Sequence, residues 1–352
     1  MEKSQREFLE SLVTAPSPAG YEQPVRHVYQ AYTQEFADSV GSDVHGNVIA
    51  IRNPSGNPRL MFAGHCDELG FQVNYVNDQG YIYFNTIGGH DAGLIPGRRV
   101  VVHNSKGPVA GVTGRRAVHL TPSSERGKPA KIENIWIDIA VADKEEAESL
   151  VSIGDPITYD TGLQNLRSGV VAGRALDNKI GTWVVAEALR RITKTDLQAS
   201  VHAVATVQEE IGLRGAETSA YSINPDVAVA VDVTHATDHP NITKQTAGDV
   251  KLGGGATISR GPNFNPLVVE KLIEAAESIG ISYQLEAAPR GTGTDANAIQ
   301  LARAGVATGL VSVPLRYMHT PSEVVALSDA DGAASLLATF ANRLTRNDEF
   351  TP

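Results

Sequence analysis

Five apolar runs in this chain each end on side chains of the kinds that bind metal ions. They end at His65 with Asp67, at Asp177, at Glu209 with Glu210, at Asp232 and at His319. Because these positions are spread over most of the chain, only its folding can bring them together. Two imidazoles and several carboxylates suit a pair of divalent ions, so the expected chemistry is metal-assisted hydrolysis.

The bulk composition is that of a packed globular protein. Of the 352 residues, 41% are hydrophobic and 20% are charged, which argues against disorder. The formal net charge is -10 and the isoelectric point is near 5.5, so neither nucleic acid nor an anionic membrane is an expected partner. A single cysteine, Cys66, rules out a disulfide within the chain.

No targeting or membrane segment is expected from the sequence. The first residues are charged and lack the apolar core of a signal peptide. No apolar run approaches the roughly 20 residues that a membrane-spanning helix needs. We therefore expect the protein to be cytoplasmic.

The pattern of elements predicts an α/β protein with an insertion. Helical spacing and apolar strands alternate in residues 1–70 and again in 165–352, whereas 71–164 shows short alternating runs separated by tight turns. Asp143 is expected to cap a helix over 143–151, and Pro266 to begin a helix that stops at Gly280. The prediction is one α/β domain (1–70 plus 165–352) interrupted by a small β-rich domain (71–164).

Each candidate ligand also has a simpler interpretation. His65 and Asp67 follow the strand expected at 59–63, where polar residues are common even without a metal. Asp177 stands where an N-cap of the next helix is expected. Glu209 and Glu210 follow a strand at 201–207, either on extended backbone that turns their side chains apart or in a plain turn.

The last two candidates differ in strength. Asp232 lies inside an apolar strand at 227–233, and a buried carboxylate must be paired, hydrogen-bonded or bound to a metal. His319, before Thr320 and Pro321, is by itself more typical of a loop. Taken together, the five runs favour one site, and the absence of thiolates among the candidates favours zinc, cobalt or manganese.

The motifs around these residues resemble those of the M42 family of di-metal aminopeptidases, which includes glutamyl and deblocking aminopeptidases and the tetrahedral TET peptidases. The motifs are GHCDELG at 64–70, ALDNK at 175–179, QEEIG at 208–212, VDVT at 231–234 and RYMHTP at 316–321. The resemblance covers nearly the whole chain in the expected order.

The resemblance implies a role for each residue. The implied metal ligands are His65 and Asp232 for one ion, Glu210 and His319 for the other, and Asp177 as the bridge. Glu209 would be the general base and Asp67 would orient His65. Two divalent ions per subunit are implied, most often zinc. The implied fold is a mixed central sheet flanked by helices, as in phosphorylase/hydrolase-like zinc exopeptidases.

The expected function is that of a metallo-aminopeptidase, a hydrolase that removes N-terminal residues from peptides. The resemblance also implies that 71–164 supports dimers that assemble into a dodecamer. The metal geometry alone would equally serve a carboxypeptidase or an N-deacylase, and some relatives are labelled endoglucanases. Two glycine-rich segments, 251–255 and 290–295, are candidate pocket walls, where Lys251 and Arg290 would suit an acidic substrate unless they are simply solvated.

Overall fold

The computed structural model describes residues 1–124, 126–193, 195 and 197–352. The described chain forms two compact units, and each is considered by itself. The larger unit comprises Met1–Glu68, Leu163–Met318 and Ser322–Pro352, and the smaller comprises Leu69–Gly162 and His319–Pro321.

The larger unit is built on an 11-stranded mixed sheet. Along the sheet the strands are β1 (Ser39–Ser42), β2 (Val48–Arg52), β12 (Ser200–Thr206), β3 (Arg59–His65), β13 (Val227–His235), β16 (Ala307–Arg316), β17 (Glu323–Ala326), β11 (Val170–Gly173) and β10 (Gln164–Asn165). Strand β14 (Ala256–Arg260) also pairs with β16, and β15 (Tyr283–Ala287) pairs with β14. The central strands β12, β3, β13 and β16 run parallel and are almost wholly buried, which explains their nearly continuous apolar sequences.

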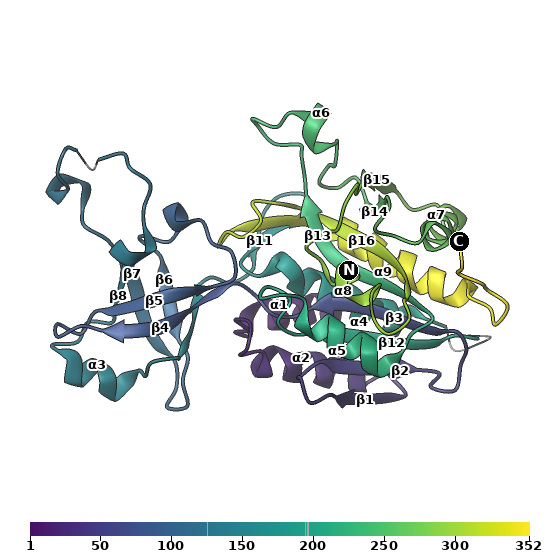
Figure 1. Cartoon of the computed structure of the whole chain (residues 1–352), viewed down its shortest axis with the longest axis horizontal. Coiled ribbons are helices and arrows are strands. Elements are labelled where there is room, and N and C mark those ends of the chain that lie inside the picture. The colour runs from purple at the N-terminus through teal and green to yellow at the C-terminus, as the bar shows by residue number, and fades with distance from the viewer. Residues whose placement is uncertain (125, 194, 196) are drawn as a thin grey trace. The chain divides into compact units, whose positions relative to one another are not determined.

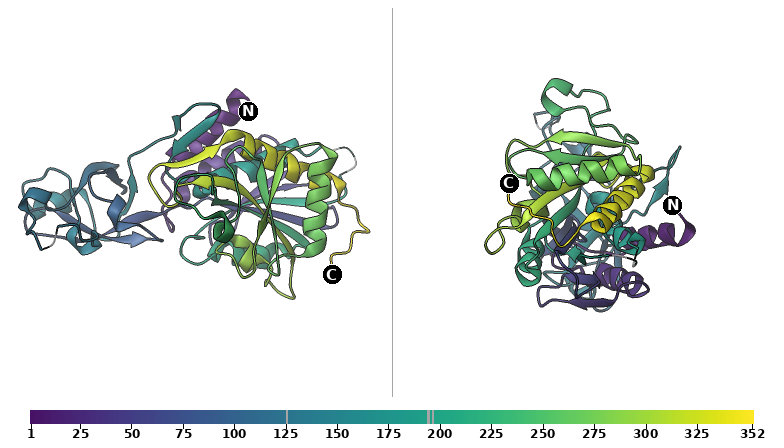
Figure 2. Two further views of the ribbon diagram at one scale, coloured as in Figure 1. Left: turned by 90° about the horizontal axis from the view of Figure 1, so that it is seen from above. Right: turned by 90° about the vertical axis from the view of Figure 1, so that its right-hand side faces the viewer.

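Helices flank this sheet (Figure 1 and Figure 2). They are α1 (Lys3–Thr14), α2 (Gln23–Gln34), α4 (Leu176–Arg191), α5 (Arg214–Ile223), α7 (Pro266–Ser278), α8 (Asp295–Ile299) and α9 (Leu327–Arg343). The short helix α6 (Lys244–Ala247) lies on a loop that projects from the sheet. Helices α4 and α9 pack together against the central strands, and α5 and α8 form another packed pair. The predicted mixed sheet with flanking helices is therefore confirmed.

Close packing of α4 on β3 depends on two glycines. A Cβ atom on Gly64 would lie 2.8 Å from the backbone carbon of Gly181, too close for two carbon atoms. Because Gly64 precedes His65, this close contact fixes the distance between α4 and the end of β3 that carries the histidine. The start of α7 is set by its own sequence, since the N-cap residue Asn265 accepts hydrogen bonds from the amides of Leu267 and Val268.

The smaller unit is a closed barrel, which confirms the predicted small β-rich component. Its strands, in order around the barrel, are β4 (Gly70–Val76), β5 (Ile82–Ile87), β8 (Trp136–Asp138), β7 (Val109–Gly114), β6 (Arg99–Val102) and β9 (Pro156–Tyr159). Helix α3 (Lys144–Leu150) has Asp143 as its N-cap, as predicted. The unit has its own core, in which Phe71 packs edge-on against Phe84 and Tyr159.

No helix within the described ranges combines the length and apolar character needed to cross a membrane.

Candidate metal centre and active site

The carboxyl ends of the central strands carry the predicted ligands. His65 is the last residue of β3, and Asp232 lies near the end of β13. Strand β12 pairs in parallel with β3 and places Thr206 beside His65, so that the chain leaves the sheet there toward Glu209. Parallel strands end at the same edge of a sheet, and that edge is where α/β proteins bind ligands.

Three carboxylates surround one imidazole nitrogen. The Nε2 atom of His65 lies 3.4 Å from an oxygen of Asp177 and 3.8 Å from oxygens of both Glu209 and Asp232. His65, Glu209 and Asp232 each offer a ligand atom, and these atoms all lie within 4.8 Å of one another. All four side chains are buried, so the structure brings four of the predicted site residues together.

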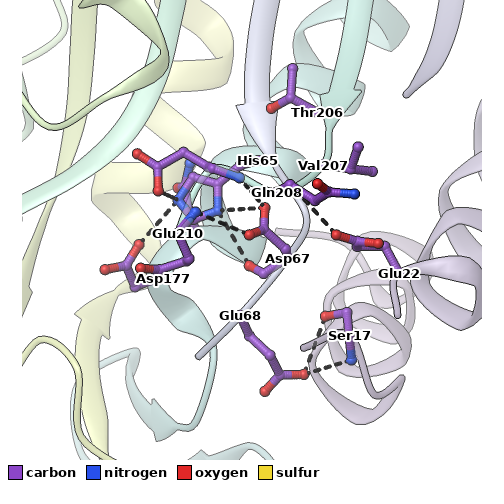
Figure 3. Close-up of polar contacts among 12 residues, drawn as sticks. Ser17, Glu22, His65, Asp67, Glu68, Asp177, Thr206, Val207, Gln208 and Glu210 are labelled. Atoms are coloured by element: carbon purple, nitrogen blue, oxygen red, sulfur yellow. Dashed lines mark hydrogen bonds and ion pairs between the residues drawn. The ribbon is translucent and has the colours of Figure 1, made fainter. Parts of the chain in front are cut away.

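Asp67 ties two of the ligand-bearing segments together, as Figure 3 shows. Its two carboxylate oxygens accept hydrogen bonds from the backbone amides of Glu209 (3.0 Å) and Glu210 (3.1 Å). One of these oxygens also lies 3.4 Å from Nδ1 of His65, on the side of the ring away from the other acids. Asp67 therefore fixes both the orientation of the histidine ring and the course of the chain that carries the two glutamates.

The backbone at Glu209 and Glu210 is a turn rather than extended chain. Gln208 has a left-handed φ of 56°, and Glu210 begins a turn. The amide of Gln208 donates to the buried carboxylate of Glu22, which also accepts from the amide of Gly20. The turn alternative is thus correct for the backbone. The contact between Glu22 and this turn was not predicted from the sequence.

The prediction that Asp177 caps its helix is wrong. The residue before α4 is Ala175, and Asp177 has a non-helical backbone inside the first turn. The side chain that accepts a hydrogen bond from a first-turn amide is that of Asn178, from Gly181 at 3.0 Å. The amide of Asp177 donates to the carboxylate of Glu323, and the side chain of Asn178 donates to the carbonyl of Val231. These contacts hold the first turn open and leave the Asp177 carboxylate directed at His65.

The acidic groups shift one another's pKa values. Burial raises the pKa of Glu209 to about 10, with His65 opposing and Asp232 adding to the rise, and burial likewise raises the pKa of Asp232 well above its usual range. Burial alone would lower the pKa of His65, but Glu209, Asp177 and Asp67 outweigh it and raise it. Neighbouring carboxylates cannot all ionise in a buried site without a compensating charge. The donor set therefore fits divalent cations, which would restore the ionised carboxylates.

Asp295, at the start of α8, is a further acidic residue, which the sequence placed at the end of the candidate pocket segment 290–295 without predicting a role beside the metal ligands. It is buried, and its pKa is raised to about 6, mainly by burial. One of its oxygens accepts a hydrogen bond from the hydroxyl of Thr206, at the end of β12. Its only sequence signal was an acid at a helix start, which is common without any function.

His319 stands apart from the other predicted ligands in the organisation of the chain. It begins the three-residue segment His319–Pro321, which clusters with the barrel unit, whereas the residues on both sides of that segment belong to the larger unit. Its backbone is left-handed, with a φ of 62°. Its role as a ligand remains a prediction.

A buried network of charges lies next to the site. The Glu68 carboxylate, directly after Asp67, accepts hydrogen bonds from the Nζ of Lys179 at 2.9 Å, from the Arg174 guanidinium and from the amide of Ser17. Arg174 and Lys179 flank Asp177 in sequence. The network therefore joins the loop that carries Asp67 to the segment that carries Asp177.

Comparisons with known proteins give a consistent result. The family model described as M42 glutamyl aminopeptidase matches residues 46–336. A putative aminopeptidase of Acetivibrio thermocellus is 37% identical, over 91% of this chain and 93% of its own. The crystal structure of a TET aminopeptidase from a marine sediment Thaumarchaeota archaeon superposes with a TM-score of 0.92, at 35% identity, over 97% of this chain and 96% of that one. The TET1 peptidase of Pyrococcus horikoshii, described as assembling into a tetrahedron or a large octahedral shell, has a TM-score of 0.86 at 30% identity and is matched over 97% of this chain and all of its own.

Proposed function

Because the chain belongs to the M42 aminopeptidase family, as its motifs predicted, and is a metal-dependent aminopeptidase, we propose that it removes N-terminal residues from peptides by water attack at the cluster around His65. The observation that carries this proposal is the meeting of three buried carboxylates at one imidazole nitrogen. Such a concentration of negative charge needs cations to be stable.

Two divalent ions would be shared among five side chains. His65 and Asp232 would hold one ion, Glu210 and His319 would hold the other, and Asp177 would contribute to both. Support comes from ligand chemistry, since Asp177, Glu210 and His319 carry carboxylate and imidazole groups of the types that bind divalent ions. Zinc is the first choice, with cobalt and manganese as alternatives for an oxygen and nitrogen donor set.

Glu209 and Asp67 have different tasks in the reaction. Divalent ions held by these residues would lower the pKa of the attacking water and polarise the peptide carbonyl. The Glu209 carboxylate takes a proton from that water as the oxygen bonds to the carbonyl carbon. It then gives the proton to the leaving nitrogen as the carbon–nitrogen bond breaks. Asp67 keeps Glu209 within reach through its amide and orients the ring of His65.

We further propose that the chain assembles into dimers through the β-rich insert and that six dimers form a dodecamer. The tetrahedral assembly described for the P. horikoshii relative supports this. Particle mass in solution tests it. A cytoplasmic location remains a prediction.

Replacing Glu209 with glutamine tests the role of the base with little change of shape. The Glu209→Gln enzyme, loaded with metal, should keep two ions per chain and lose about 10²–10⁴-fold in kcat, the usual contribution of a general base. Glu217→Gln removes an exposed carboxylate on α5 and serves as the control. Wild-type kcat in a Glu209→Gln protein that contains both ions would rule out Glu209 as the base.

A further inference from the structure

A cavity of about 240 Å³ lies in the larger unit beside the strand that carries Asp232. Its walls come from the end of β13, from the middle of β16, from β14 and β15, and from the loop that follows β15. Among its lining residues are Thr234, Ser259, Glu286, Arg290, Thr294 and Ser312. The segment around Arg290 therefore does line a pocket, as its glycines suggested, whereas Lys251 is not among the lining residues.

The pleat of the sheet places the floor of this cavity on the same face as the catalytic cluster. Side chains two apart on a strand share a face, so Thr234 lies on the side of Asp232. Asp232 is the register partner of Ser312 on β16, and Ser312 in turn pairs with Thr257 on β14. Because paired residues also share a face, the polar row continues from Asp232 across the sheet into the cavity.

Glu286 gives the cavity floor a fixed negative charge. It pairs with Ser259 in the β14–β15 ladder and therefore belongs to the same polar face. Its carboxylate accepts hydrogen bonds from the hydroxyls of Thr234 at 2.7 Å and Thr257 at 3.3 Å. The side chain is half-buried, and hydroxyl donors leave its negative charge in place. A carboxylate held in this way is oriented before any ligand arrives.

Ser312 adds an uncharged acceptor. It is only 1% exposed and lines the cavity, and its hydroxyl oxygen has no hydrogen-bond partner among the described residues. The opposing charge, Arg290, is exposed. Solvent and salt screen an exposed charge more than a half-buried one, so the carboxylate dominates the field within the cavity.

We propose that this cavity receives the side chain of the N-terminal residue of the peptide and selects lysine or arginine through Glu286. The inference rests on the proposed aminopeptidase function and names its substrate class. A lysine ammonium has three donors and no acceptor, which matches acceptors on Glu286 and Ser312. An acidic side chain would meet the same carboxylate with like charge, so the site does not serve the acidic substrates that Arg290 alone would suggest.

The test is the ratio of kcat/KM for lysine p-nitroanilide to that for leucine p-nitroanilide. A ratio measured on one preparation does not change with the fraction of folded or metal-loaded enzyme. We expect lysine and arginine substrates to be preferred over glutamate, and Glu286→Gln to lower the lysine-to-leucine ratio at least tenfold. Glu286→Lys should move the preference toward glutamate.

Glu277→Gln is the matched control, because Glu277 is an exposed carboxylate near the same strand that also accepts a bond from a hydroxyl, that of Tyr283. Its lysine-to-leucine ratio should equal that of the wild type. Hydrolysis with an unchanged ratio in Glu286→Gln would overturn the pocket assignment alone. Failure of the metal-loaded wild type to cleave any aminoacyl substrate would instead overturn the proposed function.

Discussion

Replacing Glu68 with glutamine should destabilise the protein more than most single changes. Its carboxylate is buried and, among the described residues, forms the salt bridges to Lys179 and Arg174, which are buried as well. The change leaves two cations without a counter-charge in the interior. Loss of one partner from a buried ion pair typically costs about 3–5 kcal/mol.

The pKa of Glu68 gives an independent magnitude. Burial raises this pKa, but Arg174 and Lys179 outweigh burial and lower it from 4.5 to about 2. A difference of about 2.5 at 1.36 kcal/mol per pKa unit gives about 3.4 kcal/mol of stability at neutral pH. The pKa of its partner Lys179 is also lowered, from 10.5 to about 8, because burial and Arg174 outweigh Glu68.

These two shifts disagree on whether the pairing is favourable. The Glu68 carboxylate is stabilised because several donors converge on it, whereas Lys179 also bears repulsion from Arg174. Burying the Lys179 ammonium thus costs folding free energy of a size similar to the contribution of Glu68, and Glu68 offsets this cost. Removing both groups should therefore cost less than the sum of the two single changes.

Urea unfolding at pH 7 of the wild type, Glu68→Gln, Lys179→Met and the double variant measures these terms. We expect Glu68→Gln to lose about 3–5 kcal/mol and the double variant to recover part of that loss. Glu10→Gln, which removes a half-exposed partner of Arg6 on α1, should cost under about 1 kcal/mol. A loss below about 1 kcal/mol in Glu68→Gln, or additivity in the double variant, would refute the reasoning.

The same pKa predicts a pH dependence. A carboxyl whose pKa is lowered on folding stabilises the protein fully above its unfolded pKa of 4.5 and loses that contribution as the pH falls toward about 2. Stability of the wild type should therefore fall faster between pH 4.5 and 2 than that of Glu68→Gln. Parallel curves for the two proteins would contradict this.

Two further predictions concern the site and the assembly. Asp67→Asn should weaken metal binding about 10–100-fold, because the ring of His65 and the turn at Glu209 lose a charged acceptor, and calorimetric titration of the metal-free protein measures this. An unchanged metal affinity would rule out this role of Asp67. Light scattering should give twelve times the chain mass of 37.4 kDa, and a monomer at working concentration would exclude the dodecamer.

Much of the architecture could be predicted because its signals are local. The apolar runs of β3, β12 and β13 indicate buried strands in the sequence, and Pro266 and Gly280 mark the two ends of α7. The strands β14, β15 and β17 were missed, because each is only four or five residues long. Two of these, β14 and β15, turned out to form the walls of the proposed pocket.

The site was predictable in composition but not in detail. Residue types at strand ends indicated which side chains would meet, and His65, Asp177, Glu209 and Asp232 do meet. The cap assigned to Asp177 was wrong because Asn178 accepts the bond from the amide of Gly181, while the amide of Asp177 itself donates to Glu323, 146 residues away. Glu68 was overlooked for the same reason, since its cationic partners lie 106 and 111 residues further along the chain.

Hydrolysis of free and blocked substrates before and after metal removal tests the central claim most directly. The assay compares lysine, leucine and alanine p-nitroanilides with their N-acetyl forms, using chelated enzyme to which zinc, cobalt or manganese is returned. We predict that chelation abolishes cleavage, that about two ions per chain restore it, and that only substrates with a free amino group are cleaved. Activity that survives chelation, or equal cleavage of N-acetyl substrates, would contradict the assignment of a metal-dependent aminopeptidase.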